Sequence, residues 1–402
     1  MRGMAWSRPA HTLAAATLGV AVAGMIMLAG CGGGSGSGGS GPSTPAGGRT
    51  SSPGTVTLFP GAAPPLHVSG NALVDGAGQR VILHGVDRSG GEYACVQGQG
   101  LWDGPMDQAA VTAIKAWRVD AVRVPLNEAC WNGASYVNPA FAGANYQRAV
   151  ADYVRLLNRN GMVAILDLHW TAGAYSGPGA ACASPQATCQ KPMPDRAHSV
   201  TFWRSVAQTF KGNNAVIFDL FNEPFPELAN GGNQAMAWQC WRDGGSACAG
   251  IDYQVAGMQT LVSTIRATGA RNVIMLGGIG LANDLTGWLA HQPADPDHNL
   301  AVSWHDYDTS SCNSLACWNS QVAPVIAKVP LIAGEIGDKT CTAGYLNVLM
   351  RWLDSHSASY LAWSWNADAS CASGPSLITS YSGSATVPGA AFRSHLADLA
   401  QG

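Results

Sequence analysis

Two glutamates that each follow an apolar segment are the residues best suited to carry chemistry. Glu223 stands in the sequence Asn222-Glu223-Pro224, and Glu335 follows Ala333-Gly334. Two carboxyl groups held a few ångströms apart can cleave a glycosidic bond, because one protonates the leaving oxygen while the other attacks the sugar. A lone glutamate after a strand is more often a surface cap or an ion-pair partner, so this interpretation depends on the neighbouring residues.

Polar or aromatic side chains also follow other apolar runs of the chain. These candidate site residues are Arg123, His169, Asn222, His305, Tyr307 and Trp365. One such residue would carry little weight, but their recurrence along the chain favours a common active face. Histidine beside glutamate can also hold zinc, but the sequence has no HExxH or comparable close ligand spacing. We therefore expect neither a metal nor another cofactor.

The elements that must position these residues follow a regular order. Short runs rich in valine, isoleucine and leucine alternate with longer segments of helical period, which is typical of βα units. The predicted strands are Val81–Val86, Ala121–Pro125, Val163–Leu168, Ala215–Leu220, Val273–Leu276, Leu300–Trp304, Pro330–Ala333 and Tyr360–Trp363. Eight such strands predict an α/β protein with a (β/α)8 barrel. In that fold the C-terminal ends of the strands meet on one face, where the candidate residues would converge.

The intervening segments support this arrangement. The predicted amphipathic helices are Asn145–Arg159, His198–Phe210, Tyr253–Thr268 and Tyr345–Ser355. Before the first strand, Asp75-Gly76 is a turn signal between two short apolar runs. We expect a hairpin there that closes the floor of the barrel.

The ordered residue set resembles that of glycoside hydrolase family 5, the cellulase-like members of a large barrel clan. The family has Arg after strand 2, His after strand 3, Asn-Glu-Pro after strand 4, His-x-Tyr after strand 6, Glu after strand 7 and Trp after strand 8. The matching residues here are Arg123, His169, Asn222, Glu223, His305, Tyr307, Glu335 and Trp365. The resemblance runs from about Leu66 to Leu399, with no member of the set missing.

The resemblance implies a retaining mechanism with Glu223 as acid/base and Glu335 as nucleophile. The acid must hold its proton near neutral pH, whereas the nucleophile must stay ionised to attack. Arg123 and a hydrogen bond from Tyr307 would favour the ionised form of Glu335.

By the same resemblance, Asn222 would bind the 2-hydroxyl of the substrate, and His169 and His305 would orient the glutamates and the sugar. Trp365 would be the tryptophan that contacts the sugar, followed by a cis peptide bond to Asn366. Trp363 has the same parity along the strand and is the alternative.

Several assignments stay open at this level. Glu92, Asn127 and Glu128 are predicted on the active face, where they could line the cleft or serve structure alone. The loop tryptophans could stack on sugar rings or pack on the barrel rim; these are Trp102, Trp131, Trp170 and Trp241.

The substrate is the least constrained property. We expect endo-acting cleavage of a β-1,4-linked polysaccharide, glucan more than mannan. A β-mannanase, or a hydrolase of another β-glucan or a glycoconjugate, would use the same residues. A sugar-binding lipoprotein without catalytic activity is an alternative from a different class, which the presence of both glutamates disfavours.

Composition and the N-terminus indicate where the protein works. Charged residues make up 12% of the chain and the net charge is −3, with no basic stripe, so a nucleic-acid partner is not expected. Residues 1–30 read as a signal peptide that ends before Cys31, in the pattern of a bacterial lipoprotein. Residues 31–55 would be a flexible tether and residues 56–402 the catalytic domain. We expect a monomer outside the cytoplasm, attached to the membrane only through lipid on Cys31, or secreted if unlipidated.

The other ten cysteines form an even set in a chain bound for an oxidising compartment. We predict five local disulfides: Cys95–Cys130, Cys182–Cys189, Cys240–Cys248, Cys312–Cys317 and Cys341–Cys371. The first and last would join loops that follow neighbouring strands.

Overall fold

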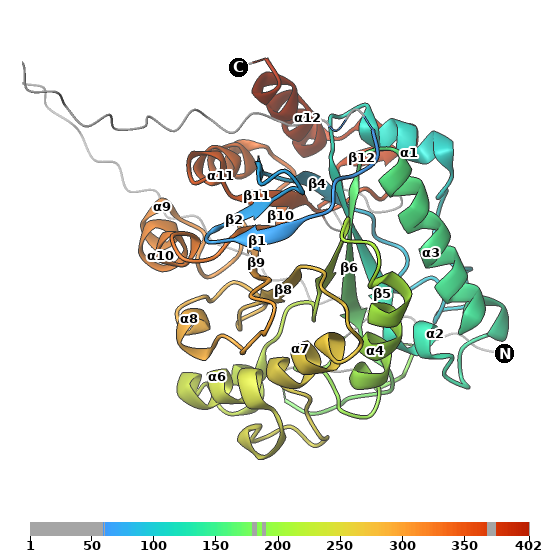
Figure 1. Cartoon of the computed structure of the whole chain (residues 1–402), viewed down its shortest axis with the longest axis vertical. Helices are drawn as coiled ribbons and strands as arrows, with labels where there is room; N and C mark the ends of the chain where they lie inside the picture. The colour runs from blue at the N-terminus through green and yellow to red at the C-terminus, as the bar shows by residue number, and fades with distance from the viewer. Residues whose placement is uncertain (1–58, 60, 179–182, 187–189, 368–374, 402) are drawn as a thin grey trace, which may run out of the picture. The chain divides into compact units, whose positions relative to one another are not determined.

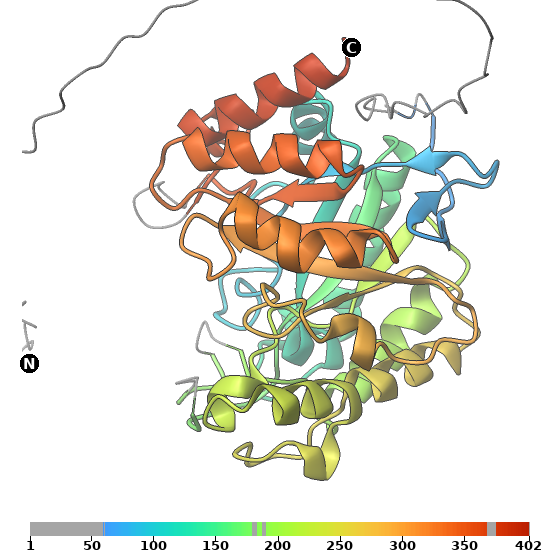
Figure 2. The same cartoon turned by 90° about the vertical axis from the view of Figure 1, so that its left-hand side faces the viewer.

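Eight parallel strands close into a barrel in the order β10-β11-β4-β5-β6-β7-β8-β9 (Figure 1). The strands are β4 (His84–Asp87), β5 (Ala121–Asn127), β6 (Val163–Trp170), β7 (Val216–Asp219), β8 (Ile274–Gly277), β9 (Leu300–Tyr307), β10 (Leu331–Gly337) and β11 (Ser359–Ala362). Helices lie outside the strands in both perpendicular views (Figures 1 and 2). The predicted (β/α)8 barrel is therefore confirmed.

The computed structural model describes residues 59, 61–178, 183–186, 190–367 and 375–401. All of them belong to the unit Ser51–Gly402. None of the helices within these ranges is long and apolar enough to cross a bilayer. Cys31, the predicted signal peptide and the whole of the predicted tether lie outside the described residues.

Each barrel helix presents an apolar stripe to the strands. In α3 the buried residues Tyr146, Val150, Tyr153, Val154 and Leu157 recur at helical spacing and so occupy one face. The helices are α1 (Gln108–Lys115), α2 (Glu128–Asn132), α3 (Ala144–Arg159), α4 (Ser199–Phe210), α5 (Pro226–Ala229), α6 (Gln234–Asp243), α7 (Met258–Arg266), α8 (Trp288–His291), α9 (Leu315–Cys317), α10 (Ala323–Ile326), α11 (Gly344–Ser355) and α12 (Val387–Leu399).

One predicted helix begins later than expected. The segment predicted as Tyr253–Thr268 is helical only over Met258–Arg266. Val255 and Ala256 instead pair with Asp195 and Gly244 across the neighbouring loops. This pairing takes up backbone groups that a longer helix would have used.

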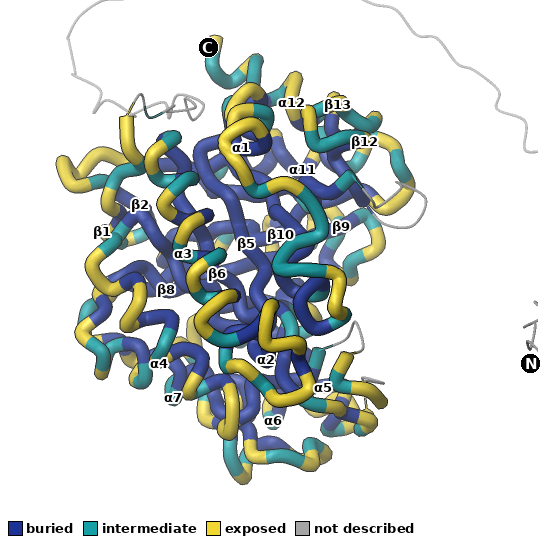
Figure 3. The backbone as a smooth tube through the Cα atoms, turned by 90° about the vertical axis from the view of Figure 1, so that its right-hand side faces the viewer, coloured by how far each residue is buried: buried dark blue, intermediate teal, exposed yellow. Residues whose placement is uncertain are grey.

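Nearly every residue of the barrel strands is buried, and these strands are dark blue in Figure 3. In β6, Val163 and Ile165 point into the barrel, whereas Ala164 and Leu166 pack against the outer helices. Because side chains alternate along a strand, the same inward parity continues to Asp167 and His169 at the C-terminal end. The inner positions therefore change from aliphatic at the floor to polar at the top.

The barrel floor is closed by a small antiparallel sheet of β1 (His67–Ser69), β2 (Ala72–Val74) and β3 (Arg80–Val81). Leu73 and Val81 pair across it and pack against the inner aliphatic residues of the barrel. The carboxylate of Asp75 accepts hydrogen bonds from the backbone of Ala77 and Gln79 and so fixes the turn. The predicted hairpin is present, and β1 extends it by one strand. A second small pair, β12 (Ile378–Ser380) and β13 (Ser384–Ala385), precedes α12.

Three of the predicted disulfides are formed in the structure. They are Cys95–Cys130, Cys240–Cys248 and Cys312–Cys317, with Cα–Cα separations of 6.2, 4.6 and 5.4 Å. The first ties the loop after β4 to α2, which follows β5 directly. Cys341 is also disulfide-bonded. Cys182, Cys189 and Cys371 lie outside the described residues, so both pairings that involve them stay predictions.

A buried aspartate links the last two helices to the barrel. Asp354 of α11 contacts the Nε2 of His395 on α12 at 2.7 Å and the hydroxyl of Tyr360 on β11 at 3.1 Å. The ring of His84 on β4 lies 3.7 Å away. Burial opposes ionisation of Asp354, but the contacts with the two histidines outweigh it and lower its pKa.

We expect Asp354→Asn to lower the free energy of unfolding by about 1–3 kcal/mol near neutral pH, because it removes a buried charged acceptor. A folded-state pKa below the unfolded one gives stabilisation that is complete above the unfolded pKa and is lost as the pH falls through the folded pKa. The difference between variant and wild type should thus shrink below about pH 4 in urea unfolding. Asp152→Asn is the control, since the Asp152–Arg155 pair is exposed and should contribute little. A deficit that stays constant down to pH 3 would contradict the linkage.

Candidate active site

A β-bulge in β10 aims Glu335 into the barrel. The register of β10 against β9 shifts between Ala333 and Glu335, so Glu335 pairs with His305 and Gly334 is passed over. A Cβ atom at Gly334 would lie 2.8 Å from the His305 ring and the Ser303 hydroxyl, so only glycine fits there. Bulges commonly re-aim side chains beside active sites. Here the bulge brings Glu335 to the inner face.

Arg123 of β5 is the centre of the cluster at the top of the barrel. It is fully buried, and its guanidinium contacts five acceptors from four strand ends. These are Asp219 (2.9 Å), Asp87 (3.0 Å), Glu335 (2.8 Å), the side-chain oxygen of Asn222 (2.9 Å) and Asp167 (3.0 Å). Burial raises the pKa of Asp219 to about 7. Burial also raises the pKa of Asp87 well above its usual range, and Arg123 opposes both shifts.

Asp87 and Asp219 are site residues that the sequence interpretation did not single out. Each ends its strand on the inward parity, next to a residue that packs outward. That parity, applied to every strand, could have identified them before the structure was known. A polar residue at an inward position of a barrel strand needs a polar partner, and Arg123 is that partner.

Glu335 is held as an ionised carboxylate. Its Oε1 accepts from Arg123, and its Oε2 accepts from the Tyr307 hydroxyl at 2.6 Å. Burial alone raises the pKa of Glu335, but His305 and Arg123 outweigh burial and lower it to about 2. The predicted partners of Glu335 therefore both contact it.

Glu223 lies in a different environment. Its side chain is 26% exposed, against 5% for Glu335. Its backbone adopts φ 50°, a left-handed conformation that costs a non-glycine residue on the order of 1–3 kcal/mol. Such strain persists only where the surroundings enforce it.

His305 connects the two glutamates. Its Nδ1 lies 3.1 Å from Glu223 Oε1 and 3.7 Å from Glu335 Oε2. One oxygen of each glutamate and one ring nitrogen of His305 all lie within 4.8 Å of one another. His305 is fixed from behind, because Asn283 donates to its backbone oxygen.

His169 and Asn222 complete the cluster. His169 Nδ1 contacts Asp167 at 2.6 Å, and the His169 ring stacks on Trp363 with centroids 5.4 Å apart. Asn222 is 4% exposed and accepts from Arg123. The structure thus brings seven of the eight predicted residues together.

Trp365 is the predicted residue that lies away from this cluster. Trp365 is fully buried in the outer core, edge-on to Trp117 at 4.8 Å. The prediction assumed that strand alternation continues to residue 365, but β11 ends at Ala362, so shared parity no longer holds. The partly exposed Trp363 takes the place beside His169, and the cis peptide bond is Trp363–Ser364 rather than the predicted Trp365–Asn366.

The loop residues whose roles the sequence left open also differ in their surroundings. Trp131 and Trp241 are fully buried, whereas Trp102 and Trp170 keep partial exposure. Glu92 accepts from Ser89 and the backbone of Gly90 within its own loop. These contacts give Glu92 a structural role in the loop after β4.

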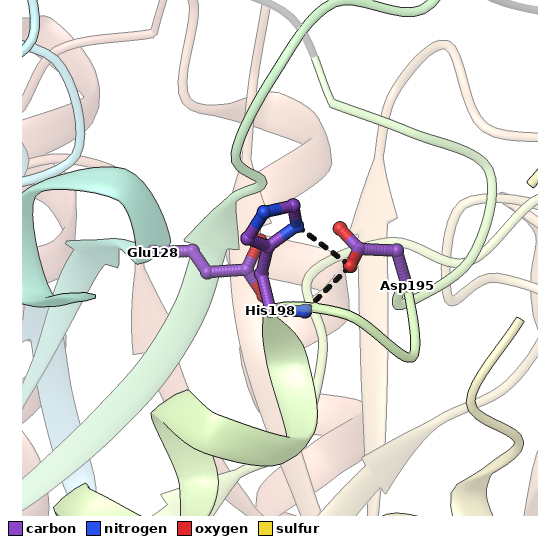
Figure 4. Close-up of side chains that lie close together, drawn as sticks. All are labelled: Glu128, Asp195 and His198. Carbon is purple, nitrogen blue, oxygen red and sulfur yellow. Dashed lines mark hydrogen bonds and ion pairs between the residues drawn. The ribbon is translucent and has the colours of Figure 1, made fainter. Parts of the chain in front are cut away.

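Glu128 belongs to a second group of close titratable residues, with Asp195 and His198 (Figure 4). It accepts from the backbone of Ala172 at 2.7 Å and from the Ser199 hydroxyl at 2.5 Å. His198 contacts Asp195 at 2.9 Å, and the ammonium group of Lys191 lies 3.0 Å from the other Asp195 oxygen. Lys191 therefore already gives Asp195 a positively charged partner, as a metal ion would. The group also joins the two ends of the β6–α4 loop.

Residues 74–369 match the family model of cellulase, glycosyl hydrolase family 5. The chain belongs to this family. It is accordingly a glycoside hydrolase.

The solved structures of similar fold include a β-glucanase, a β-mannanase and an endocellulase. A β-glucanase from Saccharophagus degradans, solved also with cellotetraose, is 17% identical with a TM-score of 0.62 in its native form, over 85% of this chain and 94% of that one. A β-mannanase from Thermomonospora fusca is 18% identical with a TM-score of 0.56, over 81% and 92%. An endocellulase from the archaeon Pyrococcus horikoshii is 15% identical with a TM-score of 0.60, over 84% and 99%. At these identities the likeness concerns the fold.

We expect Tyr307→Phe to reduce kcat/KM of this family 5 hydrolase by about tenfold to a hundredfold, because a buried charge-assisted hydrogen bond is lost. Loss of that bond raises the pKa of Glu335, so the acid limb of the kcat/KM profile should move to higher pH. The profile is measured with an aryl β-glycoside.

Tyr345→Phe is the matched control for this change. Tyr345 donates to Asp306 at 2.6 Å and has no hydrogen bond to either glutamate. It should leave the acid limb in place. An acid limb that moves equally in both variants would show that the Tyr307 bond is not what keeps Glu335 ionised.

Proposed function

We propose that the protein is a retaining, endo-acting hydrolase of a β-1,4-linked polysaccharide, with glucan as the leading substrate. The observation that carries the proposal is the close approach of Glu223 and Glu335, whose nearest oxygens lie within 4.8 Å. Retaining enzymes place their carboxyl groups about 5–5.5 Å apart, whereas inverting enzymes leave about 6.5–9.5 Å for a water molecule. The geometry supports retention.

In the first step Glu335 would attack the anomeric carbon while Glu223 gives its proton to the leaving oxygen. The glycosidic bond breaks as a covalent glycosyl-enzyme forms on Glu335. In the second step Glu223 would take a proton from water, which attacks the same carbon and releases Glu335. The two displacements together retain the configuration.

The two environments suit these roles. Arg123 and Tyr307 each hydrogen-bond one oxygen of Glu335 and keep it charged. Glu223 is the more exposed group and lies against His305, where it can exchange a proton with a leaving group or with water. Asn222 lies beside both and would bind the substrate 2-hydroxyl, a contact that strengthens in the transition state. The partly exposed Trp363 would form the sugar platform.

A β-mannanase is the second candidate. The solved structures of similar fold include both a β-glucanase and a β-mannanase, so the fold is compatible with either polymer. Glucose and mannose units differ at the 2-position, which is where Asn222 would act. A polysaccharide panel scored for reducing ends and product length distinguishes the two, and NMR of the first products gives the anomeric configuration.

The panel also tests the proposal as a whole. Oligosaccharide products of the initial β configuration are expected. Initial α products would overturn retention, and single-unit products would overturn endo action. Binding without any hydrolysis would favour a non-catalytic sugar-binding protein instead.

The two glutamates should fail differently when each is changed to alanine. Glu223→Ala should be nearly inert on polysaccharide but should release a burst of an acidic phenol from an aryl glycoside, because that leaving group needs little protonation. Azide should speed turnover and give a β-glycosyl azide. Glu335→Ala should give no burst with any leaving group.

The control is Asp243→Ala, which removes a carboxylate that is 54% exposed and should act like wild type. Equal behaviour of the two glutamate variants on the aryl substrate would reject the assigned roles.

We further propose that the enzyme acts outside the cytoplasm, anchored through lipid on Cys31. The support is the sequence Leu28-Ala29-Gly30-Cys31 after an apolar run. Cys31→Ser should release active enzyme into the medium, because stable attachment needs the acyl chains. Fractionation with an activity assay checks this, and a variant that stays with the membrane would rule out lipid on Cys31 as the anchor.

A further inference from the structure

Gln190 reaches the catalytic motif from the loop between β6 and α4. Its Nε2 donates to the backbone oxygen of Asn222 at 2.6 Å and to that of Glu223 at 2.9 Å. Its Oε1 accepts from the Asn222 side-chain amide at 2.9 Å. One side chain thus binds both residues of the Asn-Glu pair.

These contacts determine the orientation of the Asn222 side-chain amide. Its oxygen accepts from Arg123 Nη2 at 2.9 Å, and one of its N–H groups goes to Gln190. If the amide turned over, its NH2 group would meet the guanidinium and its oxygen would meet the Gln190 oxygen. Both encounters are unfavourable, so Arg123 and Gln190 together fix a single orientation. Within the described part of the chain the second N–H of Asn222 makes no hydrogen bond, and it is free for a ligand.

The same side chain supports the strained residue next in sequence. Glu223 has φ 50°, and its backbone oxygen is held by Gln190. A left-handed glutamate can relax by turning its peptide units. Hydrogen bonds to two successive carbonyl groups oppose that relaxation.

Gln190 is itself held in place by its neighbours. The backbone N–H of Lys191 donates to the Thr171 hydroxyl at 3.2 Å, and the Lys191 ammonium is paired with Asp195. The backbone oxygen of Pro192 accepts from Phe225 at 3.0 Å. Asp195 in turn belongs to the group with Glu128 and His198 shown in Figure 4. The residues that directly follow Gln190 are therefore anchored to Thr171, to Phe225 and to Asp195.

We propose that Gln190 is a positioning residue that orients Asn222 toward the substrate 2-hydroxyl and holds the backbone of Glu223. The proposal rests on the proposed function, since it concerns how that site recognises the sugar. It assigns to the β6–α4 loop a part in transition-state binding.

The test compares two substrates in two variants. Gln190→Met keeps the length of the side chain without its hydrogen bonds, and Gln190→Ala removes the side chain. Each is assayed on para-nitrophenyl β-cellobioside and on the analogue that lacks the 2-hydroxyl of the aryl-linked ring. If the polysaccharide panel favours mannan, the corresponding β-mannobiosides are used.

We expect kcat/KM on the parent substrate to fall about tenfold to a hundredfold, the effect of losing a buried hydrogen-bond partner. The fall should be in kcat more than in KM, because the 2-hydroxyl contact strengthens in the transition state. On the 2-deoxy substrate the loss should be several-fold smaller, because the contact that Gln190 supports is already absent. If one of the two variants does not fold, the comparison of substrates is made with the other variant.

Gln186→Ala is the matched control, because Gln186 lies in the same loop and bonds only to Ser184 among the described residues. It should match wild type on both substrates. Equal losses of the Gln190 variants on both substrates, or no loss on the parent, would overturn the proposal. A wild-type enzyme that cleaves neither substrate, nor any polymer of the panel, would instead defeat the proposed function.

Discussion

The ion cluster around Arg123 is the interaction on which the site depends. A single buried guanidinium meets carboxylates from β4, β6, β7 and β10, and it also holds the amide of Asn222. Removing one partner from a buried charge group leaves the others uncompensated, which typically costs several kcal/mol. The cluster therefore matters less for the stability of the fold than for the positions of the groups that it holds. It fixes the relative positions of five strand ends that are far apart in sequence.

This constraint explains why two glutamates of the same type differ in character. Glu335 lies inside the cluster, next to a permanent positive charge, and is held ionised. Glu223 stands at its edge, more exposed, with His305 as its neighbour. The difference arises from position relative to Arg123 and from solvent access, since the side chains are chemically identical. The double displacement that we propose needs two carboxyl groups in different environments.

Several contacts fasten the described parts of the loops around the site to one another. A disulfide joins Cys95 to Cys130 across the first two βα loops. Glu128 fastens both ends of the loop after β6, through Ala172 and Ser199. The Lys191–Asp195 pair lies near the start of α4. Precise placement of catalytic groups benefits from support of this kind, because small displacements reduce catalysis strongly. Strand β10 supplies Glu335, and the segment after β7 supplies Glu223.

The sequence alone determined the barrel, the order of its strands and seven of the residues at their ends. Aliphatic runs and helical periods are local patterns, and the C-terminal ends of parallel barrel strands must meet. Tertiary structure decided what depends on exact strand ends and on contacts across the closed barrel. Strand β11 stops at Ala362, so Trp365 turns into the core and Trp363 faces the site. The bulge at Gly334 aims Glu335 inward, and Gln190 meets Asn222 across 32 positions of sequence. A periodic pattern in the sequence does not encode these contacts, because they form only when the barrel closes and brings separate loops together.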